Sequence, residues 1–280
     1  MKKGALPRMG DRPGSVLSVG PESSLSEALG VMRENGVKHV VVALDGRPVG
    51  VVTARDAARF LGDGRTAGAL DEVPVKHVMQ KSVITVPEGS GDRHSQCAAR
   101  MEAFGIGAVV LVDDRGMITG IVTKTDITRE FAAAHGGRFK VGEFMSRGAL
   151  TCRGSDTVRF AADVMNRNRV SRLVVTDESG VPVGVITTGT LLHHTEYFSG
   201  GLPESGADVS RLTDGGAVTA PREGDLAAAA GLMISNKISG LPVTDPDGSL
   251  AGVTSTFDVV RAFVAAGTRD EIKHGYGEQY

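Results

Sequence analysis

The chain has 280 residues, and its 31 Lys and Arg against 33 Asp and Glu give a formal net charge of -2, which excludes a strongly basic nucleic-acid binder and a strongly acidic tail protein. Apolar residues make up 41% of the chain, enough to bury a core, and no apolar run approaches the roughly 20 residues needed to span a bilayer. The two cysteines, Cys97 and Cys152, are too few for a disulfide framework and lack metal-ligand spacing. We therefore expect a cytoplasmic protein with no membrane segment and no metal site.

The first predicted elements are a short strand at 16–19 and an amphipathic helix that starts at Leu25. Ser24 and Glu27 have the spacing of a capping box at the start of that helix. Gly36 follows the apolar pattern and is suited to end the helix in a left-handed conformation.

A β-hairpin is predicted next. The β-branched run 40–42 forms its first strand, and Asp45 with Gly46 supplies the turn. The second strand ends near Val52, and a further helix starts near Asp56. The order of elements is therefore strand, helix, strand, strand, helix.

This set of elements recurs four times along the chain, and each second hairpin strand ends in Gly-x-x-Thr-x-x-Asp or a close variant. The leading glycines are 70, 64 and 68 residues apart. The four copies of the motif are 50–56, 120–126, 184–190 and 252–258. A short segment with a similar pattern precedes each of the later units, at 75–79, 141–145 and 209–213.

The repeat divides the chain into four units, at 8–64, 74–134, 140–197 and 207–266. One such unit has too little core to be comfortably stable alone, so we expect the units to pair face to face. The polar tail 267–280 is expected to be a loose end. The fold class is α/β, built of β-α-β-β-α repeats.

The repeated motif has a chemistry that suits a nucleotide. A Thr or Ser follows the strand as a helix opens, and its hydroxyl and the unpaired amides of that helix suit a phosphate. The acid three residues later accepts hydrogen bonds only, which suits the two hydroxyls of a ribose. Ser/Thr-x-x-Asp is also a plain capping box that binds nothing, and the residues alone leave both interpretations open.

The order of elements and the Gly-x-x-Thr-x-x-Asp ending resemble the CBS domain, named after cystathionine beta-synthase, over nearly the whole chain. The resemblance implies that units 1 and 2, and units 3 and 4, pair into two Bateman modules, each with two clefts that bind adenosine-containing ligands. Four repeats in one chain, as a flat disc, are similar to the gamma subunit of AMP-activated protein kinase and to stand-alone archaeal CBS proteins.

The resemblance also assigns roles to particular positions. The phosphate-side hydroxyls fall on Thr53, Thr123, Thr187 and Ser255. The ribose acids fall on Asp56, Asp126 and Asp258. Unit 3 has Thr190 in place of the acid, so we expect up to three adenosine sites with the third unit degenerate. The adenine is expected beside the first strand of each unit, near Ser18, Thr85, Thr151 and Thr219. Basic residues before the hairpins are expected to reach phosphate from the odd units, at Lys38, His39 and Arg172.

We therefore expect a non-catalytic regulatory protein, with no obligatory cofactor, that binds AMP, ADP or ATP and signals occupancy to a protein partner such as an enzyme, kinase or transporter. A homodimer is left open. The chain has no P-loop, H-E-x-x-H or nucleophile elbow, which argues against an enzyme. The alternatives are an adaptor without ligand and a CBS protein that binds S-adenosylmethionine or NAD. Nucleic acid is not expected, because basic charge clusters in the first residues, at Lys2, Lys3, Arg8 and Arg12, with no basic face elsewhere.

Overall fold

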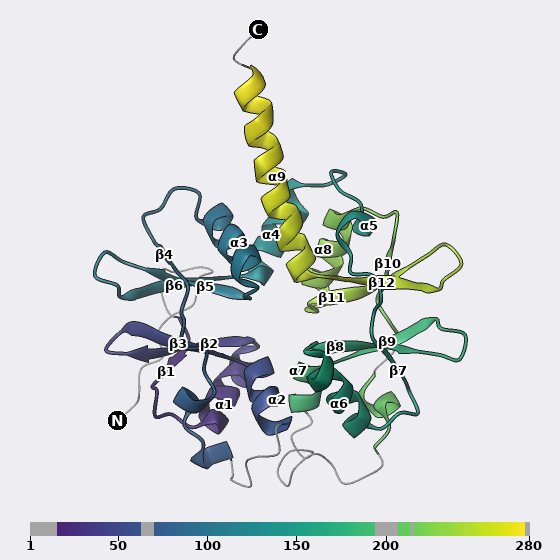
Figure 1. The fold of residues 1–280 in the computed structure, drawn as a ribbon, viewed down its shortest axis with the longest axis horizontal. Helices are drawn as coiled ribbons and strands as arrows, with labels where there is room; N and C mark the ends of the chain where they lie inside the picture. Colours follow the sequence, from purple (N-terminus) through teal and green to yellow (C-terminus); the bar gives the residue numbers. More distant parts are fainter. Residues whose placement is uncertain (1–15, 63–69, 194–206, 214–215, 278–280) are drawn as a thin grey trace.

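The computed structural model describes residues 16–62, 70–193, 207–213 and 216–277 (Figure 1). The N-terminal basic arm, the start of unit 1 and the end of unit 3, and much of the two longer linkers lie outside the described residues. No helix in the described part of the chain is long and apolar enough to cross a membrane.

Each unit contains the predicted elements in the predicted order. Unit 1 consists of β1 (Ser18–Val19), α1 (Leu25–Asn35), β2 (His39–Leu44), β3 (Arg47–Thr53) and α2 (Ala54–Gly62). Unit 2 consists of β4 (Thr85–Pro87), α3 (Arg93–Phe104), β5 (Ala108–Val112), β6 (Ile118–Thr123) and α4 (Lys124–Ala134). Unit 3 consists of β7 (Thr151–Arg153), α6 (Val158–Asn168), β8 (Arg172–Thr176), β9 (Pro182–Thr187) and α7 (Thr188–His193). Unit 4 consists of β10 (Ala220–Pro221), α8 (Leu226–Ser235), β11 (Gly240–Thr244), β12 (Leu250–Ser255) and α9 (Thr256–Gly277).

The four sheets share one topology. In each, the first strand pairs in parallel with the first hairpin strand, and the hairpin is antiparallel. The register repeats from unit to unit, with Ser18 opposite Val41 in unit 1 and Thr85 opposite Val110 in unit 2. All four hairpins also carry a register irregularity at the same place. The fold class predicted from the repeat is confirmed.

The predicted boundaries of the first helix are confirmed at atomic detail. The Ser24 hydroxyl accepts a hydrogen bond of 3.0 Å from the amide of Glu27, and Gly36 follows the helix with φ 61°. The position after the matching helix is Gly105 in unit 2, with φ 64°. The residue in this left-handed conformation is Arg169 in unit 3 and Lys237 in unit 4, each with φ 55°. A residue with a side chain adopts this conformation at a cost in free energy.

Lead-in segments complete the cores of neighbouring units. We use this term for 70–80, 139–146 and 207–213, which precede the first strands of units 2, 3 and 4, namely β4, β7 and β10. The first packs Val73, Val75 and Val78 into the core of unit 1. The second places Phe139, Val141 and Met145 in the core that includes unit 4, and the third places Val209 and Leu212 in the core of unit 3. Each segment therefore packs on the unit paired with the one it precedes.

The leading glycine of the repeated motif lets these segments approach. A Cβ on Gly50 would stand 2.3 Å from the sulfur of Met79, and one on Gly252 would stand 2.4 Å from the backbone oxygen of Ser146. The segments also pair with the motif strand through the backbone, as Val51 does with Gln80 and Val253 with Ser146. The glycine is required by close backbone contact rather than by a positive φ.

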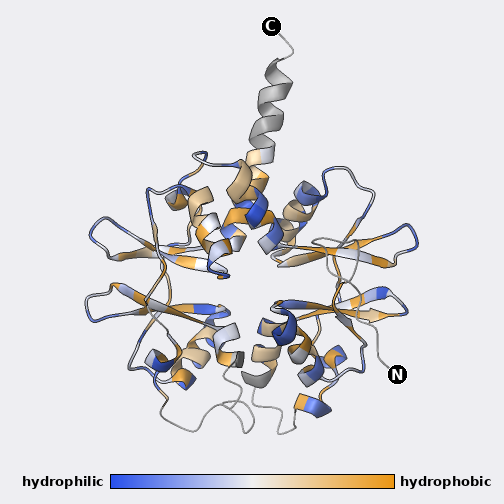
Figure 2. Ribbon diagram, turned by 180° about the vertical axis from the view of Figure 1, so that it is seen from behind, coloured by the Kyte–Doolittle hydropathy of each residue, from blue (hydrophilic) through white to orange (hydrophobic). Residues whose placement is uncertain are grey.

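The two modules join unequally around a common centre (Figure 1). Sheet residues of units 1 and 2 share a small cluster around Val41 and Val110. Helices α4, α8 and α9 bring units 2 and 4 into one continuous core. Units 1 and 3 meet through α2, α6 and α7 but keep separate cores. Figure 2 shows hydrophobic strands within the ring and hydrophilic hairpin ends at its rim.

The C-terminal segment differs from the expectation of a loose end. Helix α9 continues from the core of unit 4 to Gly277, and Figure 1 shows it projecting beyond the ring. The polar composition of 267–280 suggested a loose end, whereas the helix continues through Gly267.

We expect Gly252→Ala to lower the free energy of unfolding by about 1–3 kcal/mol, because its Cβ would strike the backbone of the lead-in segment. Gly231→Ala is the matched control: a Cβ there, within α8, meets nothing within 4 Å. Because alanine favours helix more than glycine, the control should gain about 0.5–1 kcal/mol. Urea denaturation measures the free energy of unfolding of both variants and of the native chain. Equal stabilities of Gly252→Ala and the native chain would contradict the role given to Gly252.

Candidate functional site

The repeated motif forms a reciprocal capping box in units 1, 2 and 4. In unit 2, Oδ2 of Asp126 accepts from the Thr123 amide at 2.9 Å and from its hydroxyl at 2.6 Å. Unit 1 has the same contacts between Thr53 and Asp56, at 3.0 and 2.6 Å. Unit 4 has them between Ser255 and Asp258, at 2.8 Å each. The capping interpretation of the sequence is thus realised at all three acids.

These boxes leave one carboxylate oxygen of each acid outside the cap. The hydroxyl proton of Thr or Ser is already donated to Oδ2, so the hydroxyl can contact a phosphate as donor only if that bond opens. Oδ1 remains as an acceptor toward a ligand. The geometry supports the ribose role of the acids more directly than the phosphate role of the hydroxyls.

The surroundings of Oδ1 differ between the three units. In unit 1, Gln80 of the lead-in segment donates to Oδ1 of Asp56 at 3.0 Å. In units 2 and 4 an arginine one turn later contacts it: Arg129 lies 3.2 Å from Asp126, and Arg261 lies 3.6 Å from Asp258. The Asp126 side chain is 35% exposed and that of Asp258 only 7%, so the acid of unit 2 is more accessible to solvent than the acid of unit 4.

Unit 3 has no carboxylate in its motif. The hydroxyls of Thr187 and Thr190 lie 3.0 Å apart, and the amide of Thr190 donates to Thr187 at 3.0 Å. The box is retained by hydroxyls alone and carries no charge.

The residues expected beside the adenine lie at the starts of the sheets. Ser18, Thr85 and Thr151 begin β1, β4 and β7. Thr219 lies directly before β10, which begins one residue later. All four are thus at equivalent places in the repeat, although the strands are shorter than the sequence suggested.

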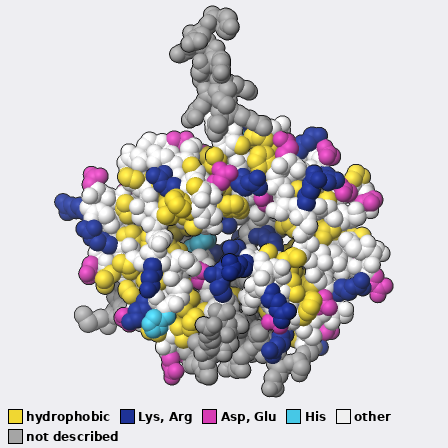
Figure 3. All heavy atoms as spheres, in the orientation of Figure 1, with side chains coloured by type: hydrophobic (Ala, Val, Ile, Leu, Met, Phe, Trp, Pro, Cys, Tyr) yellow, Lys and Arg dark blue, Asp and Glu magenta, His cyan; other side chains and the backbone are white. Residues whose placement is uncertain are grey.

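A cluster of basic side chains forms the centre of the ring. Lys38, His39 and Arg172, which the sequence singled out, come together there with two residues that it missed, Arg55 and Lys124. We call these five the central cluster. Figure 3 shows Lys and Arg side chains gathered around the hollowed middle of this face. Arg55 and Lys124 occupy variable positions inside the motif, between the Thr and the Asp, where composition alone gives no signal.

Glycines of the even units make room for two members of the cluster. A Cβ on Gly107 would stand 2.6 Å from Nε2 of His39, so this ring lies across unit 2. A Cβ on Gly240 would stand 1.7 Å from Nη1 of Arg172, whose other terminal nitrogen donates to Ser239 at 3.0 Å. Units 1 and 3 therefore extend a basic side chain over the unit with which each is paired.

Burial and mutual repulsion lower the pKa values in the central cluster. Burial, followed by Lys124, Lys38 and Arg55, lowers the pKa of His39 to about 4. Burial and then Arg55, Arg172 and Lys38 lower the pKa of Lys124 to about 8. The pKa of Arg172 falls to about 10, first through burial and then through Arg55. The pKa of Lys38 is lowered by partial burial and by Arg172.

One motif acid belongs to the same centre. Asp258 of unit 4 is buried, and burial raises its pKa despite the opposing hydrogen bonds from Ser255 and the charges of Arg261 and Arg172. It also stabilises the charged forms of Lys124 and Arg172. All four units thus contribute a charged or ionisable side chain to one place, where cations outnumber the acid.

The comparisons with known proteins establish the family. The model of the CBS domain matches residues 13–63, 75–133, 141–196 and 209–265. These four matches cover well over half of the chain, which therefore belongs to the CBS domain family.

Similar proteins share the whole arrangement. The solved structure of MJ1225 from Methanocaldococcus jannaschii, proposed there as an archaeal homologue of g-AMPK, superposes with a TM-score of 0.76 at 21% identity and covers 91% of this chain and 97% of its own. An uncharacterized protein of Pyrococcus horikoshii superposes with a TM-score of 0.63 at 19% identity, covering 92% and 97%. The uncharacterized protein MJ1404 of Methanocaldococcus jannaschii is 29% identical over 88% of this chain, which spans 59% of that relative's length. The structural likenesses show the fold.

We expect stability to fall as the pH drops from about 6.5 to about 4, because the unfolded chain protonates its histidines there while folded His39 does not. His39→Gln removes this titration, so the variant should lose about 1–3 kcal/mol less than the native chain over the same window. The exposed His77→Gln serves as control and should keep the native pH dependence. Denaturant midpoints measured between about pH 4 and 6.5 test this prediction. The same dependence of stability on pH in all three proteins would contradict the burial of His39.

Proposed function

We propose that this protein is a non-catalytic cytoplasmic sensor that binds adenine nucleotides between its paired CBS units. The observation that supports this most strongly is the central cluster, in which basic side chains of units 1, 2 and 3 meet beside the motif acid of unit 4. Crowded cations that outnumber the one nearby acid are costly in the free protein and favourable to a bound phosphate.

Unit 2 offers the most complete set of groups for such a ligand. Lys124 opens α4, whose N-terminal amides add partial positive charge. Asp126 lies two residues further along, and its side chain is 35% exposed with Oδ1 in contact with Arg129. A phosphate at Lys124 and a ribose at Asp126 fit the short spacing of a nucleoside monophosphate. Thr85 at the start of β4 marks the adenine side in this proposal.

The central cluster also provides a route for signalling. Arg55 belongs to one module and Arg172 to the other, and each disfavours the charged form of its neighbours. An anion bound between them removes this repulsion and favours arrangements that bring the modules together. A ligand can signal its occupancy to an enzyme, kinase or transporter only if it binds one arrangement of the modules more tightly than another.

The adaptor without ligand is a second candidate, because the motif acids do cap their helices in this structure. On that alternative the boxes contribute only stability, about 0.5–2 kcal/mol each, and the partner or a second copy of the chain binds regardless of nucleotide.

We expect Asp126→Asn to weaken AMP binding by about 10-fold to 100-fold, because the amide retains an oxygen for the cap but replaces the outward Oδ1 acceptor with a donor. Asp114→Asn, the same change at an exposed turn, should bind AMP as the native chain does. Isothermal titration calorimetry with AMP, ADP and ATP measures both. Native affinity in a combined Asp56, Asp126 and Asp258 to Asn variant would favour the adaptor.

We expect AMP affinity to fall above pH 8, by up to about tenfold per pH unit, because unliganded Lys124 loses its proton there and the phosphate favours the protonated form. Lys124→Arg keeps the charge and should flatten this dependence between pH 7.5 and 9.5, about the range below the pKa of Arg172. Lys76→Arg, which is paired with Glu22 at the surface, is the matched control and should retain the slope. A slope that survives in Lys124→Arg contradicts the placement of phosphate at Lys124.

A further inference from the structure

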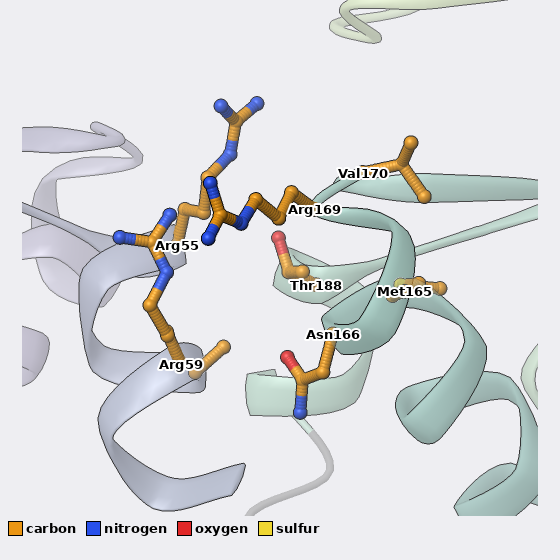
Figure 4. A pocket seen from close by; sticks show the side chains of 8 residues that line it. Arg55, Arg59, Met165, Asn166, Arg169, Val170 and Thr188 are labelled. Atoms are coloured by element: carbon orange, nitrogen blue, oxygen red, sulfur yellow. The ribbon is translucent and has the colours of Figure 1, made fainter. Parts of the chain in front are cut away.

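A second group of basic side chains, which shares Arg55 with the central cluster, lies between units 1 and 3. Arg55 and Arg59 come from α2, and Arg169 follows α6, and all three line a pocket with Asn166 and Thr188 (Figure 4). Figure 4 shows Arg59 and Arg169 extending toward each other from the two sides of the interface, whereas the end of Arg55 points away from Arg59. None of the residues that line this pocket carries a carboxylate.

Arg59 lacks the partner that its counterparts have. Arg129 and Arg261, at the same place in units 2 and 4, each contact Oδ1 of their own motif acid, at 3.2 and 3.6 Å. In unit 1 that oxygen, on Asp56, accepts from Gln80 instead. Within the described part of the chain, no ion pair of Arg59 takes its place, so its guanidinium is free to face the interface.

Arg169 is held in a conformation that does not favour an arginine. Its φ is 55°, at a helix end where units 1 and 2 have glycine. A residue with a side chain is strained there, and strain of this kind is often found where a side chain is needed in one direction. The left-handed turn sends Arg169 across to α2 (Figure 4).

The interface between units 1 and 3 is not closed by a shared apolar core. Units 2 and 4 close their shared face with a continuous apolar core, whereas the cores of units 1 and 3 remain separate. Arg55 donates to the hydroxyl of Ser171 at 3.1 Å, so one polar contact already crosses between α2 and unit 3. Three exposed guanidinium groups thus surround a site without a hydrophobic seal.

We propose that this pocket binds a free phosphate-class oxyanion, inorganic phosphate or pyrophosphate, at a site that adjoins the central cluster through Arg55 and is distinguished from it by Arg59 and Arg169. Guanidinium groups bind such oxyanions through paired, charge-assisted hydrogen bonds. The amide of Asn166 and the hydroxyl of Thr188 can donate to the remaining oxygens. The anion neutralises the repulsion between the arginines and links module 1–2 to module 3–4 at the face that lacks a shared core.

The test uses the full chain and calorimetric titrations with inorganic phosphate and with pyrophosphate, with and without saturating AMP. Arg169→Gly and Arg59→Gln should each weaken anion binding by about tenfold or more, while AMP affinity stays at the native value. Arg169→Gly should fold well, because glycine occupies this position in units 1 and 2. Lys237→Gly is the matched control, since it relieves the same left-handed strain in unit 4 and should leave anion binding unchanged.

These titrations distinguish anion binding at this pocket from anion binding at the nucleotide sites. Anion binding that AMP displaces and that survives in both arginine variants belongs to the central cluster and overturns the proposal. Absence of any heat with millimolar phosphate or pyrophosphate on the native chain overturns it as well. Native AMP affinity in the combined Asp56, Asp126 and Asp258 to Asn variant, with anion binding retained, would remove the proposed nucleotide function alone.

Discussion

Core completion by the lead-in segments is the constraint on which the rest of the structure depends. A β-α-β-β-α unit of this size leaves its helices incompletely covered, and the chain covers them with a segment taken from beside the neighbouring unit. Because Val75 belongs to the core of unit 1 although it precedes unit 2, those units cannot separate without exposing apolar side chains. Pairing into modules is therefore a requirement of burial.

The centre of the ring is built from charged side chains rather than from apolar ones. There the chain gathers like charges instead of burying apolar groups, and burial together with the neighbouring cations lowers the pKa values of His39 and Lys124. The fold tolerates this cost because the apolar contacts lie elsewhere, in the sheets and in the core shared by units 2 and 4. The apolar contacts and the gathered charges thus occupy different layers of the same repeat.

Much of the fold could be predicted because its signals are local. Turn residues, capping pairs such as Ser24 with Glu27, and the repeated motif mark the elements before any packing is known. The site was predicted less completely. His39 and Arg172 stood out by position in the repeat, but Arg55 and Lys124 vary between copies and gave no signal. The C-terminal helix was missed because a glycine and a polar composition resemble a helix end, whereas α9 extends from a well-packed first half.

The sequence by itself determined the number of units, the order of their elements and the acids of the capping boxes, since each depends on residues a few positions apart. Tertiary structure alone decided which unit each lead-in segment completes, which charges meet at the centre, and that Gln80 rather than Arg59 contacts Asp56. These depend on groups far apart in the chain, whose encounter is set by how apolar faces are covered. Periodicity reports which faces are apolar, but it does not report which segment covers them.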